Sequence, residues 1–255
     1  MAWLRTDEGV EHLLLGFDAS FCVDAGRGAV LIGPTLASVL GSEARWLPLE
    51  EARHVVGEDD AREALRRFHD AAAPSTWAAR VHLRTGDGEL RAHSYSAQVL
   101  HDVEGHTFVL GAHGDAAELE PRRLATADVP EAAGAYALLV NIDGRVLDYA
   151  FARGALHDMP AERVLGTTVF DRMAPTQVEV GRRTLRHCIE QREVLWAERA
   201  VPIRGQIRTL ITKHVPVGGD RCLLVARDVT EARGYRERLQ SARFELERLT
   251  AAIPG

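Results

Sequence analysis

The sequence predicts an α+β protein made of two similar units, each a five-stranded antiparallel sheet with helices on one face, followed by a helical tail. Three observations support this prediction. Short runs of alternating apolar residues recur in the same order in both halves of the chain. Turns rich in Gly and Asp separate these runs, and one longer helical stretch interrupts each half. After residue 228 the pattern changes to a heptad repeat.

The first unit is expected within residues 1–114, with an N-terminal helical cap. A helix is predicted at about residues 58–73. The strands of this unit are predicted at residues 19–24, 29–32, 77–84, 90–100 and 107–113. Residues 115–134 are expected to be a linker, because Pro121 and Pro130 disfavour one continuous helix there.

The second unit is expected at residues 135–230 and repeats the order of the first. Its first two strands flank Asp143 and Gly144, a strong hairpin signal. A helix is predicted at residues 176–191. The strands are predicted at residues 137–142, 145–151, 194–204, 208–216 and 221–228.

The tail, residues 231–255, carries an apolar a/d seam over three heptads with charged flanks. This spacing favours a coiled coil and therefore a homodimer; the alternative is a helix that packs on its own domain. The seam positions are Ala232, Tyr235, Leu239, Ala242, Leu246, Leu249 and Ile253.

Length and charge limit the function classes. With 255 residues the chain has room for about two domains. A formal net charge of -6 argues against nucleic acid or an anionic membrane as a partner, because phosphate binding needs concentrated positive charge. No apolar run reaches the ~20 residues of a membrane span, and the three distant cysteines indicate neither a disulfide framework nor a zinc site. We therefore expect a cytoplasmic location.

Four segments resemble PAS domains, the sensory modules of bacterial signalling proteins. Asn-Ile-Asp-Gly-Arg-Val-Leu at residues 141–147 is similar to their opening hairpin. Residues 160–166 and 169–175 are similar to their short-helix region. Arg-Asp-Val-Thr-Glu at residues 227–231 resembles the Asp-Ile-Thr element that closes many PAS domains, with Val in place of Ile.

The resemblance implies two tandem PAS domains in the sensory region of a signalling protein. It implies that Asp228 and Thr230 couple the last strand to an output helix, and that the output, a histidine kinase or a cyclase domain, lies outside this chain. The chain is then expected to be part of a longer sensor. The first copy departs from the pattern, since its last strand lacks the Asp-Ile-Thr element.

A ligand in such a fold would lie between the sheet and the helices, where apolar side chains with a few polar ones suit a small molecule. A filled core is the alternative interpretation of the same residues. The expected lining residues are Phe68, His69 and Trp77 in the first unit, and Tyr149, Phe151, Phe170, Met173, Leu185 and Trp196 in the second.

No cofactor is favoured. Haem stays open because His69 shares the apolar face of its predicted helix with Phe68, and a small organic ligand stays open as well. Flavin of the photoreceptor type is not expected, since no Asn-Cys-Arg-Phe-Leu-Gln run surrounds a cysteine. The histidines show no metal-ligand spacing.

Two function classes remain after the motif search. The chain lacks a Gly-x-x-x-x-Gly-Lys loop, a Gly-x-Ser-x-Gly elbow and a His-Glu-x-x-His pair, so no catalytic residue is predicted. The first hypothesis is a sensory module that transmits a signal through its C-terminal helix. The alternative is a ligand-free PAS scaffold for dimerisation and protein interaction.

Overall fold

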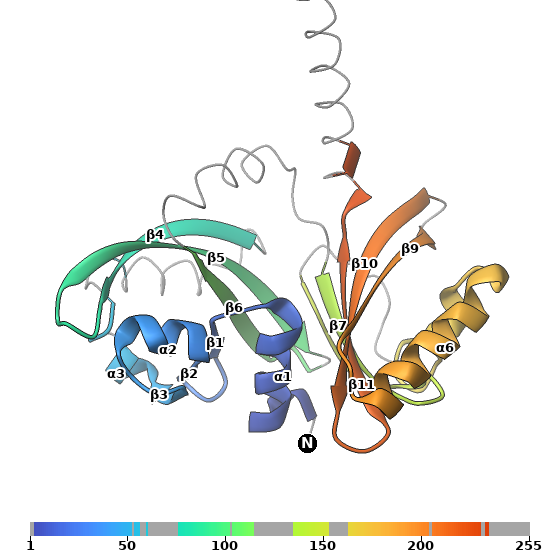
Figure 1. The fold of residues 1–255 in the computed structure, drawn as a ribbon, viewed down its shortest axis with the longest axis horizontal. Coiled ribbons are helices and arrows are strands. Elements are labelled where there is room, and N and C mark those ends of the chain that lie inside the picture. The colour runs from blue at the N-terminus through green and yellow to red at the C-terminus, as the bar shows by residue number, and fades with distance from the viewer. Residues whose placement is uncertain are drawn as a thin grey trace, which may run out of the picture.

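A computed structural model describes the chain at residues 3–52, 54–56, 60, 76–102, 104–114, 135–152, 163–203, 206–230 and 233–234. In this part of the chain eleven strands form one antiparallel sheet (Figure 1). The strand order is β3-β2-β1-β6-β5-β8-β7-β11-β10-β9, and β4 pairs with β5 outside this path.

The first set of strands precedes residue 115. It comprises β1 Phe21–Asp24, β2 Ala29–Ile32, β3 Arg45–Pro48, β4 Thr76–Arg84, β5 Leu90–Asp102 and β6 Thr107–Gly114. All five predicted strands are confirmed, and β3 is an additional edge strand that the sequence pattern did not indicate. The helices here are η1 Trp3–Arg5, α1 Asp7–Phe17, α2 Pro34–Leu40 and α3 Leu49–Ala52. Apart from residue 60, the helix predicted at residues 58–73 lies outside the described residues.

The second set of strands follows residue 134 and confirms the five predicted strands. It comprises β7 Ala135–Asn141, β8 Val146–Phe151, β9 Leu195–Ile203, β10 Gln206–Val217 and β11 Arg221–Asp228. The predicted long helix is confirmed as α6 Pro175–Gln191, preceded by η3 Val169–Arg172. The order β8-β7-β11-β10-β9 repeats the order β2-β1-β6-β5-β4 of the first set.

The two sets join at a short seam between β5 and β8. His101 pairs with Phe151, and Asp102 pairs with Ala150. Strand β4 occupies the same edge of β5 only as far as Gln98. Strand β8 therefore continues the edge where β4 ends, and the hydrogen-bonded sheet runs through both sets.

Helix α1 covers the face of the sheet opposite to α6, so the prediction of helices on one face was incomplete. It contacts β10 and β11 of the second set as well as β1 and β6 of the first. Its buried side chains join residues of both sets in one apolar cluster, here called the shared core. Members from α1 and the two sets include Val10, Leu13, Phe17, Leu100, Phe108, Val215 and Leu223.

The local sequence explains where α1 begins and ends. The side chain of Thr6 caps the first turn by accepting a hydrogen bond from the backbone N–H of Gly9 at 3.1 Å. Asp18 ends the helix in the left-handed conformation, at φ 53°. Lys213 on β10 fixes this end, since its Nζ lies 2.6 Å from the carbonyl oxygen of Leu15 and 2.6 Å from Oδ1 of Asp18.

Strand residues alternate between the two faces of the sheet, and this alternation creates a second interior for each set. In the second set, Leu223 and Val225 of β11 face α1, whereas Cys222 and Leu224 face α6. The interior on the α6 side is called the α6-facing core. Its buried members are Val140, Val146, Tyr149, Val164, Phe170, Leu185, Cys188, Ile189, Cys222 and Leu224.

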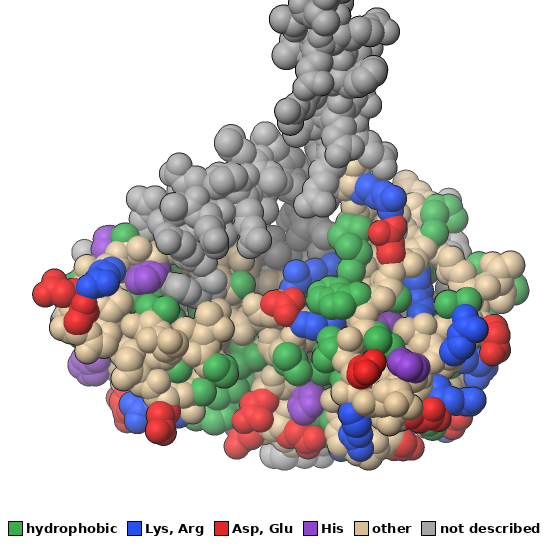
Figure 2. Space-filling model, in the orientation of Figure 1, with side chains coloured by type: hydrophobic (Ala, Val, Ile, Leu, Met, Phe, Trp, Pro, Cys, Tyr) green, Lys and Arg blue, Asp and Glu red, His purple; other side chains and the backbone are tan. Residues whose placement is uncertain are grey.

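Charged side chains of both signs are interspersed on the described surface shown in Figure 2, and basic ones gather over α6. Three arginines of α6 are exposed: Arg182, Arg183 and Arg186. Within the described residues, no helix combines the length and the apolar character needed to cross a bilayer.

Candidate functional site

The α6-facing core brings together five of the residues predicted to line a ligand site. Tyr149, Phe170 and Leu185 are buried, and Phe151 and Met173 pack against them. The rings of Tyr149 and Phe151 are stacked, with centroids 5.6 Å apart. Five of the six residues predicted to lie in the interior of the second unit therefore do lie together in one core.

A tight turn and a short cap place Phe170 in this core. Gly144, in the hairpin between β7 and β8, has φ +78°, and a Cβ there would overlap the Phe170 ring. Thr168 and Asp171 form a capping box at the start of η3. Arg182 closes the outside of the same ring, with its Cζ 4.5 Å from the ring centroid.

Trp196 does not belong to this core, and its assignment there was wrong. It pairs with Lys213 across β9 and β10, and it is 59% exposed. Lys213 points to α1, so Trp196 lies on that face of the sheet, with the Lys213 Nζ 5.1 Å from its ring centroid. A shift of one residue along a strand reverses the face, which is why the sequence pattern misplaced this side chain.

The three candidates of the first unit have side chains outside the described part of the structure. Phe68 and His69 lie outside the described residues. Trp77 pairs with Ala97 through its backbone in β4, and its side chain is also outside the described part of the structure.

The α6-facing core also contains polar side chains that the sequence analysis missed. Arg199 of β9 donates from Nη1 to the Sδ atom of Met173 at 3.1 Å. Burial lowers the pKa of Arg199, which nevertheless remains cationic at neutral pH. His214 of β10 is buried, and its burial together with the charge of Arg199 lowers its pKa to about 4. His214 is therefore neutral at pH 7.

The end of β11 carries the two residues predicted to couple the sheet to the tail. Oδ1 of Asp228 accepts hydrogen bonds from the backbone N–H of Thr230 at 2.9 Å and from its hydroxyl at 2.6 Å. The Thr230 hydroxyl oxygen in turn accepts from the backbone N–H of Thr209 in β10 at 2.8 Å. Arg208 Nη1 lies 3.3 Å from Oδ2 of Asp228. These contacts, the Asp228–Thr230 cluster, tie β10, β11 and residue 230 together.

Residues 230, 233 and 234, at and beyond this cluster, are helical. The backbone N–H of Arg233 donates to the carbonyl oxygen of Val229 at 2.9 Å, and its side chain pairs with Glu198 on β9. The seam residues predicted for dimerisation, Ala232, Tyr235, Leu239, Ala242, Leu246, Leu249 and Ile253, lie outside the described residues.

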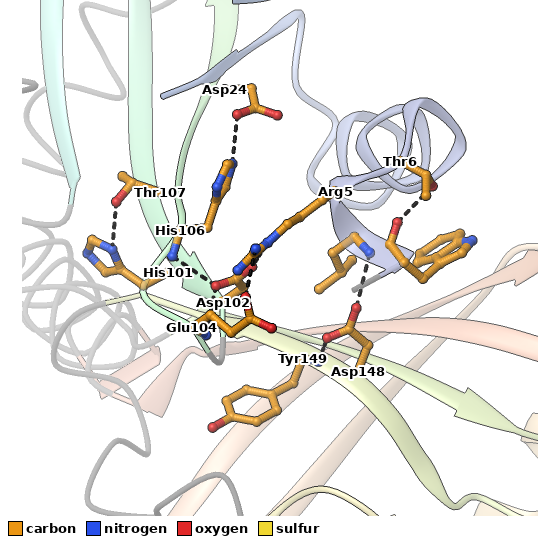
Figure 3. A network of polar contacts seen from close by, with 12 residues as sticks. Arg5, Thr6, Asp24, His101, Asp102, Glu104, His106, Thr107, Asp148 and Tyr149 are labelled. Atoms are coloured by element: carbon orange, nitrogen blue, oxygen red, sulfur yellow. Dashed lines mark hydrogen bonds and ion pairs between the residues drawn. The ribbon is translucent and has the colours of Figure 1, made fainter. Parts of the chain in front are cut away.

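A polar network at the seam between the two strand sets was also not predicted (Figure 3). Arg5 Nε lies 2.6 Å from the buried carboxylate of Asp102, and Arg5 Nη1 lies 2.8 Å from Glu104. Burial favours a higher pKa for Asp102, but the bonds from Arg5 and from two backbone amides outweigh it and leave this pKa lowered. The carboxylate of Asp148 on β8 accepts from the backbone N–H of Leu4 at 3.1 Å.

The same network reaches the turn between β1 and β2. Nε2 of His106 lies 2.7 Å from Oδ1 of the buried Asp24, and Arg27 Nε lies 3.2 Å from Oδ2. Arg27 also pairs with Asp7 at the start of α1. Arg27 and Asp24 are three residues apart, but the other pairs of this network join residues 20 to 144 apart in the chain, so no local sequence signal could have revealed them.

Two cysteines meet inside the α6-facing core. The Sγ atoms of Cys188 in α6 and Cys222 in β11 lie 3.7 Å apart, and both residues are buried. The hydrogen bond between them and burial raise the pKa of Cys222. The described part of the chain shows no cluster of three or more metal-ligating side chains.

Comparison with known proteins agrees with this architecture. A family model described as "PAS fold" matches residues 131–234. No curated protein matches the chain.

Several solved structures are similar. The PAS domain of the RpfR quorum-sensing receptor from Cronobacter turicensis, in complex with BDSF, is 19% identical over 40% of this chain and 99% of its own, with a TM-score of 0.34. A PAS domain from Colwellia psychrerythraea is 21% identical over 44% and 98%, with a TM-score of 0.33. The PAS domain of BvgS from Bordetella pertussis is 20% identical over 51% and 98%, with a TM-score of 0.30.

The family match spans the whole second strand set, α6 and the Asp228–Thr230 cluster. The chain therefore contains a PAS domain, at residues 131–234.

Proposed function

We propose that this chain is a sensory module of a signalling protein. The PAS domain detects a small ligand or another signal in its α6-facing core. The Asp228–Thr230 cluster passes the resulting change to residues 231–255, which form a helix that dimerises and leads to an output domain, a histidine kinase or a cyclase, outside this chain. The module acts in the cytoplasm.

The Asp228–Thr230 cluster is the observation that carries this proposal. Asp228 lies at the end of β11, a strand that pairs with β7 on one side and with β10 on the other. Both oxygens of the Asp228 carboxylate have partners. Thr230 binds β10 through the backbone N–H of Thr209. A shift of β10 relative to β11 must therefore move the first turn of the tail, because these hydrogen bonds have short and directional geometry.

The division of the chain supports the same proposal. The repeated strand order favours two tandem PAS-like domains, at residues 1–114 and 135–230, joined by a linker at 115–134. The first strand set has no counterpart of the Asp228–Thr230 cluster at the end of β6, where the sequence reads Gly-Ala-His-Gly. We therefore assign direct output to the second domain alone.

Hydrogen–deuterium exchange of the full chain tests the proposed coupling. The probe is a methanol extract of bacterial metabolites, compared with buffer, and native mass spectrometry reports whether a component stays bound. We expect bound material to slow exchange in α6 and also in residues 228–234. The double variant Asp228→Asn, Thr230→Val should keep the first effect and lose the second. Asp220→Asn, in the exposed β10–β11 turn, is the matched control.

Retention of both effects in the double variant would refute the coupling route. A chain that binds nothing from the extract and shows no change in exchange would refute sensing by this core. It would then favour the ligand-free scaffold.

A further inference from the structure

Cys188 and Cys222 place two thiols in contact inside the α6-facing core. Their Sγ atoms lie 3.7 Å apart, although the two residues are 34 positions apart in the chain. One belongs to α6 and the other to β11, and both have 0% exposure. The fold therefore brings together, across the interface between helix and sheet, the two groups from which a disulfide can form.

A disulfide needs only a small movement from this geometry. The bond between two sulfur atoms is about 2.0 Å long, so the Sγ atoms must approach each other by about 1.7 Å. Cys222 is held on both sides, because it pairs with Val140 of β7 and with Pro216 of β10. We therefore expect the approach to come from the side chain of Cys188 and from a slight shift of α6 toward β11.

The two thiols are chemically unequal. The hydrogen bond between them lowers the pKa of Cys188, whereas the same hydrogen bond and burial raise the pKa of Cys222. The thiolate, not the thiol, is the form of cysteine that reacts with an oxidant. Cys188 is therefore the residue that reacts first, and Cys222 is a protonated thiol held beside it.

The position of Cys188 in α6 gives a small oxidant access to it. Cys188 lies in the last turn of the helix, which ends at Gln191 and is followed by Arg192 in the left-handed conformation, at φ 57°. Helix ends open more readily than helix centres. Opening of this turn exposes the Cys188 thiol while the strands around Cys222 stay paired, and it admits hydrogen peroxide more readily than a bulky disulfide.

We propose that Cys188 and Cys222 form a reversible disulfide when the chain meets hydrogen peroxide, and that this bond fixes α6 to β11. Disulfides of cytosolic proteins are usually of this transient, redox-responsive kind. The proposal goes beyond the sensory function proposed above, because the disulfide needs neither a ligand in the core nor a dimeric tail in order to form.

The reaction consumes one peroxide molecule and two thiols. The Cys188 thiolate attacks one oxygen of the peroxide, the O–O bond breaks, and the products are a sulfenic acid and a hydroxide that takes up a proton to become water. Cys222 loses its proton and attacks the sulfur of the sulfenic acid. The S–S bond forms, the S–O bond breaks and a second water leaves, so the two electrons lost by the thiols reduce the peroxide to water. Exchange with a small dithiol restores both thiols.

Thiol counting in the full chain tests the proposal. The reduced chain is treated with a small excess of hydrogen peroxide, unfolded and labelled with a maleimide, and peptide mapping locates the bond. We expect the number of labelled thiols to fall from three to one, with the remaining label on Cys22, and dithiothreitol to restore all three. Glutathione disulfide at the same concentration should react at least ~10-fold more slowly, because it is too large for the opened turn.

Three alanine variants assign the roles of the cysteines. Cys222→Ala should stop at a sulfenic acid on Cys188, which dimedone traps, whereas Cys188→Ala should remain almost unmodified. Cys22→Ala is the matched control, since Cys22 is equally buried but lies in the shared core, and it should form the disulfide at the wild-type rate. The measurement on the wild-type chain does not depend on whether these variants fold.

Hydrogen exchange of the wild-type chain before and after peroxide treatment shows the structural effect, and we expect slower exchange in the last turn of α6 in the oxidised form. Three labelled thiols after treatment, or a bond that includes Cys22 or joins two chains, would overturn the assignment. So would conversion of Cys188 to a sulfinic acid without a bond to Cys222. Equal rates with glutathione disulfide would overturn peroxide as the oxidant. None of these results bears on binding from the metabolite extract, so the two proposals fail separately.

Discussion

Replacing Leu13 by alanine should weaken both strand sets at once. Leu13 lies in the middle of α1 and is fully buried in the shared core. Large-to-small changes at such positions cost about 2–5 kcal/mol, because apolar contact is lost and a cavity remains. Leu15, two residues later, is 50% exposed and is the matched control, for which we expect a cost of about 1 kcal/mol or less.

Urea unfolding followed by circular dichroism gives the two free energies. For a chain of this size 1 kcal/mol corresponds to about 2–4 °C in melting temperature, so a cost of about 2–5 kcal/mol should lower the melting temperature of Leu13→Ala by about 4–20 °C. Hydrogen exchange locates the effect. Because α1 contacts β10 and β11 as well as β1 and β6, amides in all four strands should lose protection in Leu13→Ala and not in Leu15→Ala.

Two results would refute this reasoning. Equal destabilisation by the two substitutions would mean that α1 contributes only as a helix and not through the shared core. Loss of protection confined to β1 and β6 would mean that α1 belongs to the first strand set alone.

Three further substitutions have defined outcomes in urea unfolding. Gly144→Ala should cost at least ~2 kcal/mol more than Gly219→Ala, because both residues have positive φ but only a Cβ at 144 meets the aromatic ring beneath it; equal costs would contradict the steric argument. The pKa of His214 is held at about 4, so the unfolded chain binds a proton between pH 6.5 and 4 that the folded chain does not. Stability should therefore fall by up to about 3 kcal/mol as the pH falls through this window, in wild type and in His187→Gln but not in His214→Gln; a wild-type profile equal to that of His214→Gln would disprove it. Asp102→Asn should cost about 1.5–3 kcal/mol at pH 7. Because the pKa of Asp102 is lowered, this difference should shrink as the pH falls below the ordinary value of 3.8, and a difference independent of pH would exclude the ion pair as its cause.

The sequence predicts those parts of the fold that depend on neighbours in the chain. The hairpin at Gly144 and the long helix α6 follow from turn chemistry and from helical periodicity, and the Asp228–Thr230 contact spans two residues. Leu185 was assigned to the apolar face of its helix from the helical phase, and the structure places it in the α6-facing core together with Phe170.

Other features depend on contacts that one sequence does not reveal. Trp196 changes face with a one-residue change of register. Arg199 and His214 sit in an alternating strand pattern, and nothing in that pattern says which polar residues turn inward. The ion pair of Arg5 with Asp102 joins residues 97 apart in the chain. Strand β3 has a single buried residue and ends in Pro48, a residue type that disfavours a strand, so the sequence pattern did not indicate it.

The position of α1 determines how the chain must fold during its synthesis. Helix α1 is made before the strands that it contacts, and its contact from Leu15 to Lys213 spans 198 residues. At a translation rate of ~5–20 residues per second, about 10–40 s pass before this partner emerges. During that interval, of the four strands that α1 contacts in the described structure, β1 and β6 have been made and β10 and β11 have not. A neighbouring nascent chain that has already exposed β10 and β11 can accept it, so domain-swapped dimers are the misfolded product that this topology favours.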